Sequence, residues 1–160
     1  MSAMPIEAKS EMLIRSPAAQ VYEAFVDPAI TTKFWFTKSS GRLEPGANLR
    51  WDWELYDVFV NVNVKALEYG RRILIEWSSA DDAPTTVEWV FKARPDNTTF
   101  VTITNFGFQG DVKEVAQQAV NSTEGFTFVL AGLKALLEHH VRLNLIQDRH
   151  PDGLPQRTSA

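Results

Sequence analysis

Side chains able to perform acid–base or metal chemistry are few in this sequence, and their spacing separates them. His139 and His140 are adjacent, so on a helix their side chains point about 100° apart and cannot share one metal ion; His150 lies beyond them. We expect the adjacent pair near a helix C-terminus, where the helix dipole favours a cation. The absence of cysteine excludes a thiol nucleophile, a disulfide and a cysteine-ligated metal. No Ser/His/Asp order or phosphate-binding loop is present, so we predict no catalytic residue, no metal and no cofactor.

The acidic residues Asp52 and Glu54 stand two apart and could form an acid–base pair on one face of a strand. They alternate with Trp51 and Trp53, however, and a half-buried strand turns its polar residues to solvent. We therefore expect both carboxylates on the outer face of a sheet. Asp57 comes near the end of the same hairpin, where a turn role and a site role both remain open.

Aromatic residues are the most prominent candidates for binding, with ten Phe and five Trp in the chain. Each ring buries about 150–250 Å², so one explanation is that the inward rings only fill the core. A bent sheet and a straight helix leave space between them, however, and the same rings could line an apolar cavity for a small molecule. The residues predicted to line this pocket are Trp35, Trp51, Trp53, Trp77, Trp89, Phe91, Phe126 and Leu130.

Length and composition indicate one globular domain over residues 1–150 and a loosely ordered tail over residues 151–160. A formal net charge of −4 argues against nucleic acid as a partner, because a phosphate backbone requires a clustered basic surface. No stretch approaches the roughly 18 apolar residues of a membrane span, and no signal-peptide pattern opens the chain. We expect a soluble cytoplasmic protein.

In the N-terminal two thirds of the chain, the residue pattern predicts a strand, two short helices and then a sheet. Residues 6–15 form the expected strand, and Ser16 and Pro17 supply an N-cap hydroxyl and a first helical residue. Apolar residues then repeat at helical spacing until Asp27-Pro28 interrupts the helix. Over residues 41–108 the period changes to two with recurrent turn signals, which predicts an antiparallel meander with one apolar face.

The C-terminal third returns to helical spacing. Asp111 is a plausible cap for a short helix that ends near Val120. Asn121 and Glu124 then resemble a capping box, so we predict that a second, long helix begins there and packs its apolar side on the sheet. The fold class is therefore α+β, a curved antiparallel sheet with a long C-terminal helix.

Four blocks of the chain, in the right order, resemble the heat shock protein 90 ATPase activator homologue family. This family belongs to the START-like, polyketide cyclase/Bet v 1-like (SRPBCC) superfamily. The blocks are residues 16–28 with the Phe-Trp-Phe triplet at 34–36, the RRILIEW segment at 71–77, residues 101–108 and residues 125–138. The resemblance covers nearly the whole chain.

The resemblance implies the helix-grip fold, with about six or seven strands around the helix and an internal cavity, but no reaction, because one fold hosts many functions. The founding member has a separate domain that docks on its chaperone, and a chain of this size has no room for one. A chaperone partner is therefore weakly implied. Asn105 stands where many members carry His, which reduces the case for a general base on that strand.

We interpret the chain as a non-enzymatic carrier or sensor of an apolar, aromatic or lipid-like small molecule. One alternative is a cyclase- or hydrolase-like enzyme acting on a polyketide-type substrate, and another is an interaction module that regulates a chaperone ATPase. An acidic side chain of residues 52–57, or Asn105, turned inward beside an open pocket would favour the enzyme. An edge strand of the sheet could also build a symmetric homodimer.

Overall fold

The structure is a computed structural model that describes residues 5–79 and 82–153, and these residues form a seven-stranded antiparallel sheet. The strand order is β1-β7-β6-β5-β4-β3-β2: from β2 to β7, strands that follow one another in the chain pair, and β1 pairs with the free side of β7. The strands are β1 Ala8–Ile14, β2 Lys38–Ser39, β3 Asn48–Trp53, β4 Val58–Glu68, β5 Arg72–Ser78, β6 Thr85–Ala93 and β7 Thr99–Phe106.

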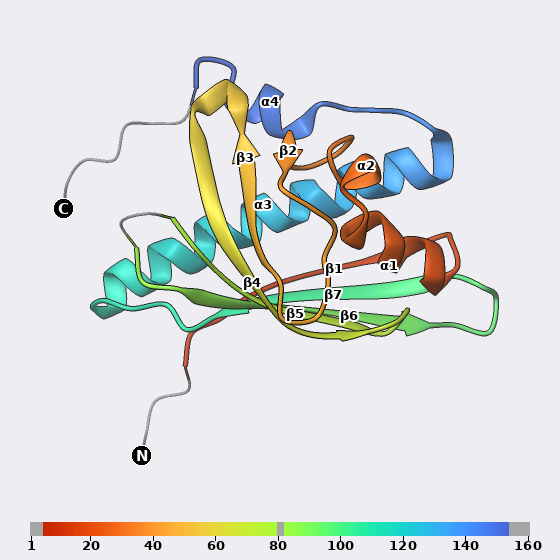
Figure 1. Cartoon of the computed structure of the whole chain (residues 1–160), viewed down its shortest axis with the longest axis horizontal. Helices are drawn as coiled ribbons and strands as arrows, with labels where there is room; N and C mark the ends of the chain where they lie inside the picture. The colour runs from red at the N-terminus through yellow and green to blue at the C-terminus, as the bar shows by residue number, and fades with distance from the viewer. Residues whose placement is uncertain (1–4, 80–81, 154–160) are drawn as a thin grey trace.

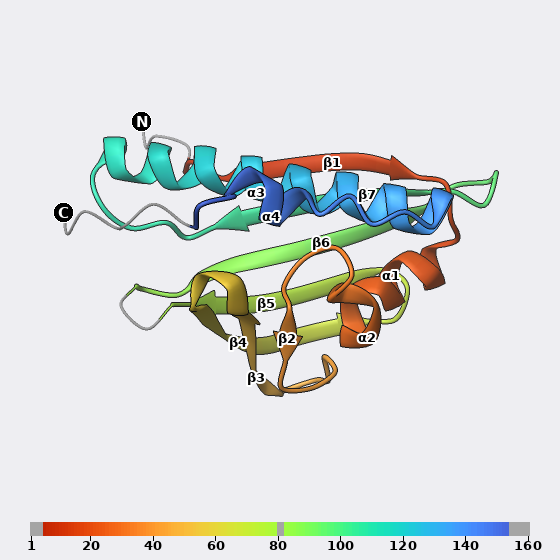
Figure 2. The same ribbon diagram turned by 90° about the horizontal axis from the view of Figure 1, so that it is seen from above.

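The helices lie on one side of this curved sheet (Figure 1). They are α1 Ala18–Val26, α2 Pro28–Thr31, the 3₁₀ turn η1 Glu54–Tyr56, α3 Val112–His139 and α4 Leu145–Arg149. The long helix α3 runs along β1 and β7, whereas α1 and α2 cover one end of the neighbouring strands (Figure 2). The predicted α+β helix-grip fold is confirmed.

The long helix α3 begins at Val112, so the predicted break near Val120 is wrong. Asp111 caps the helix by accepting a hydrogen bond of 2.8 Å from the Glu114 amide. Asn121 does not cap a second helix, because its side-chain oxygen accepts a hydrogen bond of 3.0 Å from Gln117 one turn earlier. Pairs of this i,i+4 kind lie on a continuous helix surface, and the buried Ala119 shows that packing on the sheet already holds this segment.

The start of α1 also differs from the prediction. Pro17, with extended backbone angles, occupies the N-cap position, and no side chain caps the helix. The Ser16 hydroxyl donates a hydrogen bond of 2.6 Å to the Gln20 side chain instead of binding a backbone amide. Ser16 is thus one residue too early to act as the cap.

One aromatic-rich core joins the sheet, α1 and α3. On the strands, alternate residues are almost fully buried, as the period of two predicts: Ile73, Ile75, Val87, Trp89, Val101 and Ile103. The facing side of α3 contributes Phe126, Val129, Leu130 and Leu133. Where β4 pairs with β5, the register shifts between Val64 and Ala66, and such irregularities bend a strand.

The C-terminal end of the described chain turns back over the molecule. The helix α3 ends at His139, with His140 as its cap in a left-handed conformation, as expected for the adjacent histidines. Most of the tail predicted over residues 151–160 lies outside the described residues. None of the helices in the described ranges has the length and apolarity needed to cross a membrane.

Gly125 weakens the helix α3 without a packing reason. Gly125 lies inside α3, and a Cβ placed there would meet no atom within 4 Å. Gly125→Ala should therefore raise the free energy of unfolding by about 0.5–1 kcal/mol, measured by urea denaturation, because alanine is the better helix former. Gly132→Ala is the matched comparison, since its Cβ would lie 3.4 Å from the Phe34 Cβ. No gain in stability at Gly125, or a loss there, would contradict this account.

A buried carboxylate fastens the C-terminal half of α3 to the end of β1. Glu138 accepts hydrogen bonds from the Arg15 amide (2.9 Å) and from Lys134 Nζ (2.7 Å), and Lys134 Nζ also donates to the Leu13 carbonyl (2.9 Å). Burial alone would raise the pKa of Glu138, but these donors outweigh it and hold the pKa below its ordinary value.

Because the folded-state pKa of Glu138 is depressed, its stabilising contribution is complete above the ordinary glutamate pKa of about 4.3 and is lost as the pH falls below it. We expect Glu138→Gln to lower the free energy of unfolding by about 1 kcal/mol at neutral pH. The deficit should shrink in acid, where the wild-type carboxyl is protonated too. Urea denaturation across the acid range, with the exposed Glu44→Gln as control, measures this; a deficit independent of pH would refute it.

Candidate functional site: a cavity between sheet and helix

A cavity of about 620 Å³ lies between the first half of α3 and one end of the sheet. The strand ends that border it are the start of β4, the end of β5, the start of β6 and the end of β7, which meet at one edge because the strands are antiparallel. This is the end opposite to α1, whose Tyr22 ring instead contacts Phe91 and Tyr69 near the other ends of β6 and β4.

The cavity exists because the space between sheet and helix is filled at only one end. At the α1 end, Phe25 and Phe34 pack edge to face at 5.5 Å, and Gly132 of α3 approaches Phe34 closely. At the other end, Gly125 borders the cavity and contributes no side chain. The helix thus remains close to the core near residue 132 and leaves open space near residue 125.

Aromatic rings form much of the cavity wall. Trp35, Trp53, Trp77 and Phe126 line it, from the segment after α2, from β3, from β5 and from α3 respectively. Trp77 and Phe126 stack at a centroid distance of 5.6 Å, and Trp35 contacts Phe126 at 5.6 Å and Trp53 at 6.2 Å. Four of the eight residues predicted for the pocket are therefore brought together at one surface.

The other four predicted residues lie in the core and do not line the cavity: Trp51, Trp89, Phe91 and Leu130, each at most 4% exposed. Trp51 stacks on Phe36 at 4.6 Å, while Trp89 and Phe91 pack against Phe25. The alternation along a strand identifies which residues point inward, but not which of them α1 and α2 cover. Ligand binding by the eight residues stays a prediction.

A polar network that local residue spacing did not predict lies at the cavity wall. Asn105, only 3% exposed, donates hydrogen bonds from Nδ2 to Thr85 Oγ1 (3.0 Å) and to the Thr86 carbonyl (2.8 Å). Its Oδ1 accepts a hydrogen bond of 2.8 Å from the Ser122 hydroxyl. Trp77 Nε1 donates to the same Thr85 oxygen at 3.0 Å. The network joins β5, β6, β7 and α3.

The sequence carried a signal for part of this network. Val87 and Ile103 point inward, and side chains two residues apart on a strand share a face. Thr85 lies two residues before Val87 and Asn105 two residues after Ile103, so the alternation predicts that both polar side chains point inward too. Ser122 could not be placed, because the helix that carries it was expected to begin only one residue earlier.

The C-terminal segment lies beside the tip of the β3–β4 hairpin (Figure 1), and residues of both segments border the cavity and form its mouth. The Tyr56 hydroxyl of η1 donates a hydrogen bond of 3.0 Å to the Ile146 carbonyl of α4, and the Tyr56 ring contacts His150 at 6.0 Å. Arg149 bonds Glu124 of α3 at 2.8 Å. Burial raises the pKa of Tyr56, and the nearby Asp148 carboxylate raises it further, so the hydroxyl remains a donor at neutral pH.

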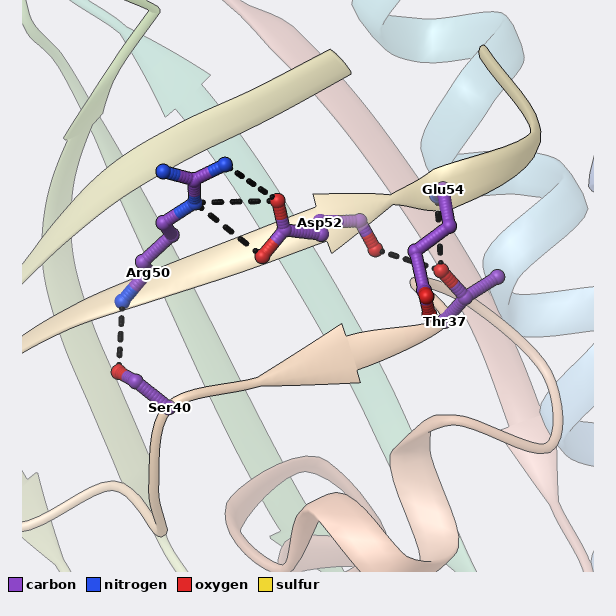
Figure 3. Close-up of polar contacts among 5 residues, drawn as sticks. All are labelled: Thr37, Ser40, Arg50, Asp52 and Glu54. Carbon is purple, nitrogen blue, oxygen red and sulfur yellow. Dashed lines mark hydrogen bonds and ion pairs between the residues drawn. The ribbon is translucent and has the colours of Figure 1, made fainter. Parts of the chain in front are cut away.

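The carboxylates considered for acid–base chemistry do not line the cavity. Asp52 binds the Arg50 guanidinium at 2.9 Å on the outer face of β3, as expected (Figure 3). Glu54 does not share that strand face, because β3 ends at Trp53; its backbone amide donates a hydrogen bond of 2.9 Å to the Thr37 hydroxyl oxygen. Asp57 is exposed and has a left-handed conformation at the end of η1, which assigns it the turn role.

Metal ligation has no candidate in the part of the chain that the structure describes. Within residues 5–79 and 82–153, no three His, Cys, Asp or Glu side chains gather closely enough to hold an ion. The cavity wall offers apolar contact from aromatic rings and hydrogen bonding from hydroxyl and amide groups, and it is bordered by the ionisable residues Asp82, Glu124, Arg149 and His150.

The sheet that grips a long C-terminal helix, with a cavity between the two, defines the START-like class of helix-grip proteins. Residues 15–138 match the family model described as Activator of Hsp90 ATPase homolog 1-like protein, and the chain belongs to this family. Comparison with curated protein sequences gives no match.

Solved structures share the fold of this chain. Protein SSP2350 from Staphylococcus saprophyticus is 30% identical, with a TM-score of 0.73 over 86% of this chain and 96% of that one. DynU16, a protein of the dynemicin biosynthetic locus, is 22% identical with a TM-score of 0.74, and the match covers 85% of this chain but 48% of DynU16. The Aha1 dimer from Colwellia psychrerythraea is 17% identical with a TM-score of 0.69, over 84% of this chain and 97% of that one. The two latter likenesses concern the fold.

The hydrogen bond from Tyr56 to Ile146 should hold α4 in place at the cavity mouth. Tyr56→Phe removes the hydroxyl that binds the Ile146 carbonyl, so the amides of α4 should exchange about threefold to tenfold faster in hydrogen–deuterium exchange, the effect of losing one hydrogen bond. Tyr69→Phe is the control, because Tyr69 is 73% exposed and far from α4 in the fold. Unchanged exchange in the Tyr56 variant would show that the hydroxyl does not hold α4 in place.

Proposed function

We propose that this protein binds a small apolar or aromatic molecule in the cavity between α3 and the sheet. The observation that carries the proposal is a cavity of about 620 Å³ whose wall contains seven Phe, Tyr and Trp residues, among them the four predicted rings from four separate segments. Ligand pockets in proteins commonly have about 300–1,000 Å³ and apolar walls with a few placed polar groups.

The distribution of polar groups supports binding rather than a merely unfilled core. Dry packing defects are lined by apolar atoms alone, whereas this cavity has Asn105, Thr85 and Ser122 on its wall in a defined network. Such groups orient a ligand, while stacking on Trp77 and Phe126 supplies the contact area. The ionic groups at the mouth, Glu124 and Arg149, already bond each other.

A cyclase-like enzyme is the second candidate, and the inward orientation of Asn105 favours it. An amide cannot take up or release a proton near neutral pH, so Asn105 could only orient a substrate. The carboxylates at 52, 54 and 57 lie away from the cavity, and the two carboxylates that border it, Asp82 and Glu124, bind Ser79 and Arg149. We therefore rank binding without turnover first. The chaperone-regulating role and the homodimer stay predictions, because no feature of the described residues bears on either.

Fluorescence titration with N-phenyl-1-naphthylamine, a neutral aromatic probe, tests the proposal. We expect saturable quenching of tryptophan emission at one probe per chain, because Trp35, Trp53 and Trp77 line the cavity. Gly125→Leu should weaken binding at least about tenfold, since the new side chain extends into the open space beside residue 125. Val120→Leu, an exposed position on the same helix, is the matched control. Absence of saturable quenching, or equal affinity in the Gly125→Leu variant, would contradict binding in this cavity.

A further inference from the structure

The directions of the hydrogen bonds around Asn105 are fixed by chemistry. The Thr86 carbonyl oxygen, 2.8 Å away, can only accept, so the amide nitrogen of Asn105 must face it. The same nitrogen then donates its second hydrogen to Thr85 Oγ1. The amide oxygen consequently faces Ser122, whose hydroxyl must donate to it. No alternative orientation of the Asn105 side chain satisfies the Thr86 carbonyl.

Thr85 receives two donors at its hydroxyl oxygen. One is the Asn105 amide at 3.0 Å and the other is the Trp77 indole N–H at 3.0 Å, and an indole nitrogen can only donate. Both lone pairs of the Thr85 oxygen are therefore occupied, and the hydroxyl has only its hydrogen left to offer. No residue in the described parts of the chain accepts that hydrogen, and Thr85 borders the cavity.

The position of Thr85 makes this donor directional. Thr85 is the first residue of β6, directly opposite Trp77 in the β5–β6 register, which brings the indole within reach. Its side chain lies on the same face of β6 as the buried Val87 and Trp89. Ser122, having donated its hydrogen to Asn105, presents only acceptor lone pairs. The Asn105 network thus presents one defined donor, Thr85, and, on the other side of the Asn105 amide, one defined acceptor, Ser122.

We infer that Thr85 is the specificity-determining donor of this cavity, and that it selects an aromatic ligand bearing a neutral carbonyl oxygen, such as a polycyclic ketone or quinone. The inference rests on the proposed function and names its ligand class. A hydrocarbon of the same shape leaves the Thr85 hydrogen without an acceptor. A ligand carbonyl supplies that acceptor. The hydrogen bond from Thr85 then replaces the one that the carbonyl loses when it leaves water.

The matched probes 9-fluorenone and fluorene test the inference, because they differ only by a carbonyl in place of a methylene. The measurement is equilibrium dialysis of each compound against the full chain. A purely apolar cavity would favour fluorene, since the ketone loses a hydrogen bond to water. We expect the wild-type protein to bind 9-fluorenone at least as tightly as fluorene. Preference of the wild type for fluorene would overturn the inference, whatever the variants do.

The variants assign the effect to one side chain. Thr85→Val should lower the affinity ratio of 9-fluorenone to fluorene by about threefold to tenfold, the value of one hydrogen bond, and Thr85→Ser should retain the wild-type ratio. Thr104→Val on the outer face of β7 is the control. An unchanged ratio in Thr85→Val would overturn the role of Thr85. If that variant does not fold, Thr85→Ser together with the wild-type ratio still decides the question, because loss of ketone preference in the serine variant would also overturn it.

The outcomes separate this inference from the proposed function. If neither compound binds the wild-type chain, the cavity does not take ligands of this size and the proposed function fails with the inference. If both bind and Thr85→Val leaves their ratio unchanged, the proposed function stands and the carbonyl selectivity is refuted.

Discussion

The packing of Trp35 between the sheet and α3 is the interaction on which the rest of the structure depends. Trp35 is 6% exposed, and its ring contacts Trp51 of β3 at 5.1 Å, Trp89 of β6 at 6.1 Å and Phe126 of α3 at 5.6 Å. A straight helix diverges from a twisted sheet, and interiors tolerate few voids, so a large side chain must fill the space where the two separate. One side of Trp35 is closed by the core and the other side borders the cavity.

The two sides of this boundary satisfy their polar groups differently. On the core side, the Trp89 indole N–H is buried and has no hydrogen-bond partner among the described residues, an arrangement that costs about 1–3 kcal/mol. On the cavity side, the Trp77 indole N–H bonds Thr85, and Asn105 uses both its amide hydrogens and its oxygen. Aromatic packing therefore takes precedence in the core, whereas directed hydrogen bonds are concentrated where the wall borders the cavity.

Periodicity predicted most of the fold because burial on one face imposes a period of two on strands and 3.6 on helices. It failed at the start of α3, where Asn121 and Glu124 match a local capping pattern but instead bond Gln117 and Arg149 on the surface of one continuous helix. It likewise identified eight inward apolar residues without distinguishing the four at the cavity from the four that are buried in the core. That distinction depends on which element covers each strand end, and no local pattern encodes it.

The sequence by itself determined the α+β class, the family resemblance, the aromatic supply of the inner face and the outward position of Asp52, because each follows from local spacing or residue type. Only the tertiary structure decided where the cavity opens, that Thr85, Asn105 and Ser122 meet there, and that α4 returns to its mouth. These features join segments up to 90 residues apart in the chain, as the Tyr56–Ile146 bond does. Contacts over such separations arise from the packing of α3 on a curved sheet, and the spacing of neighbouring residues carries no record of them.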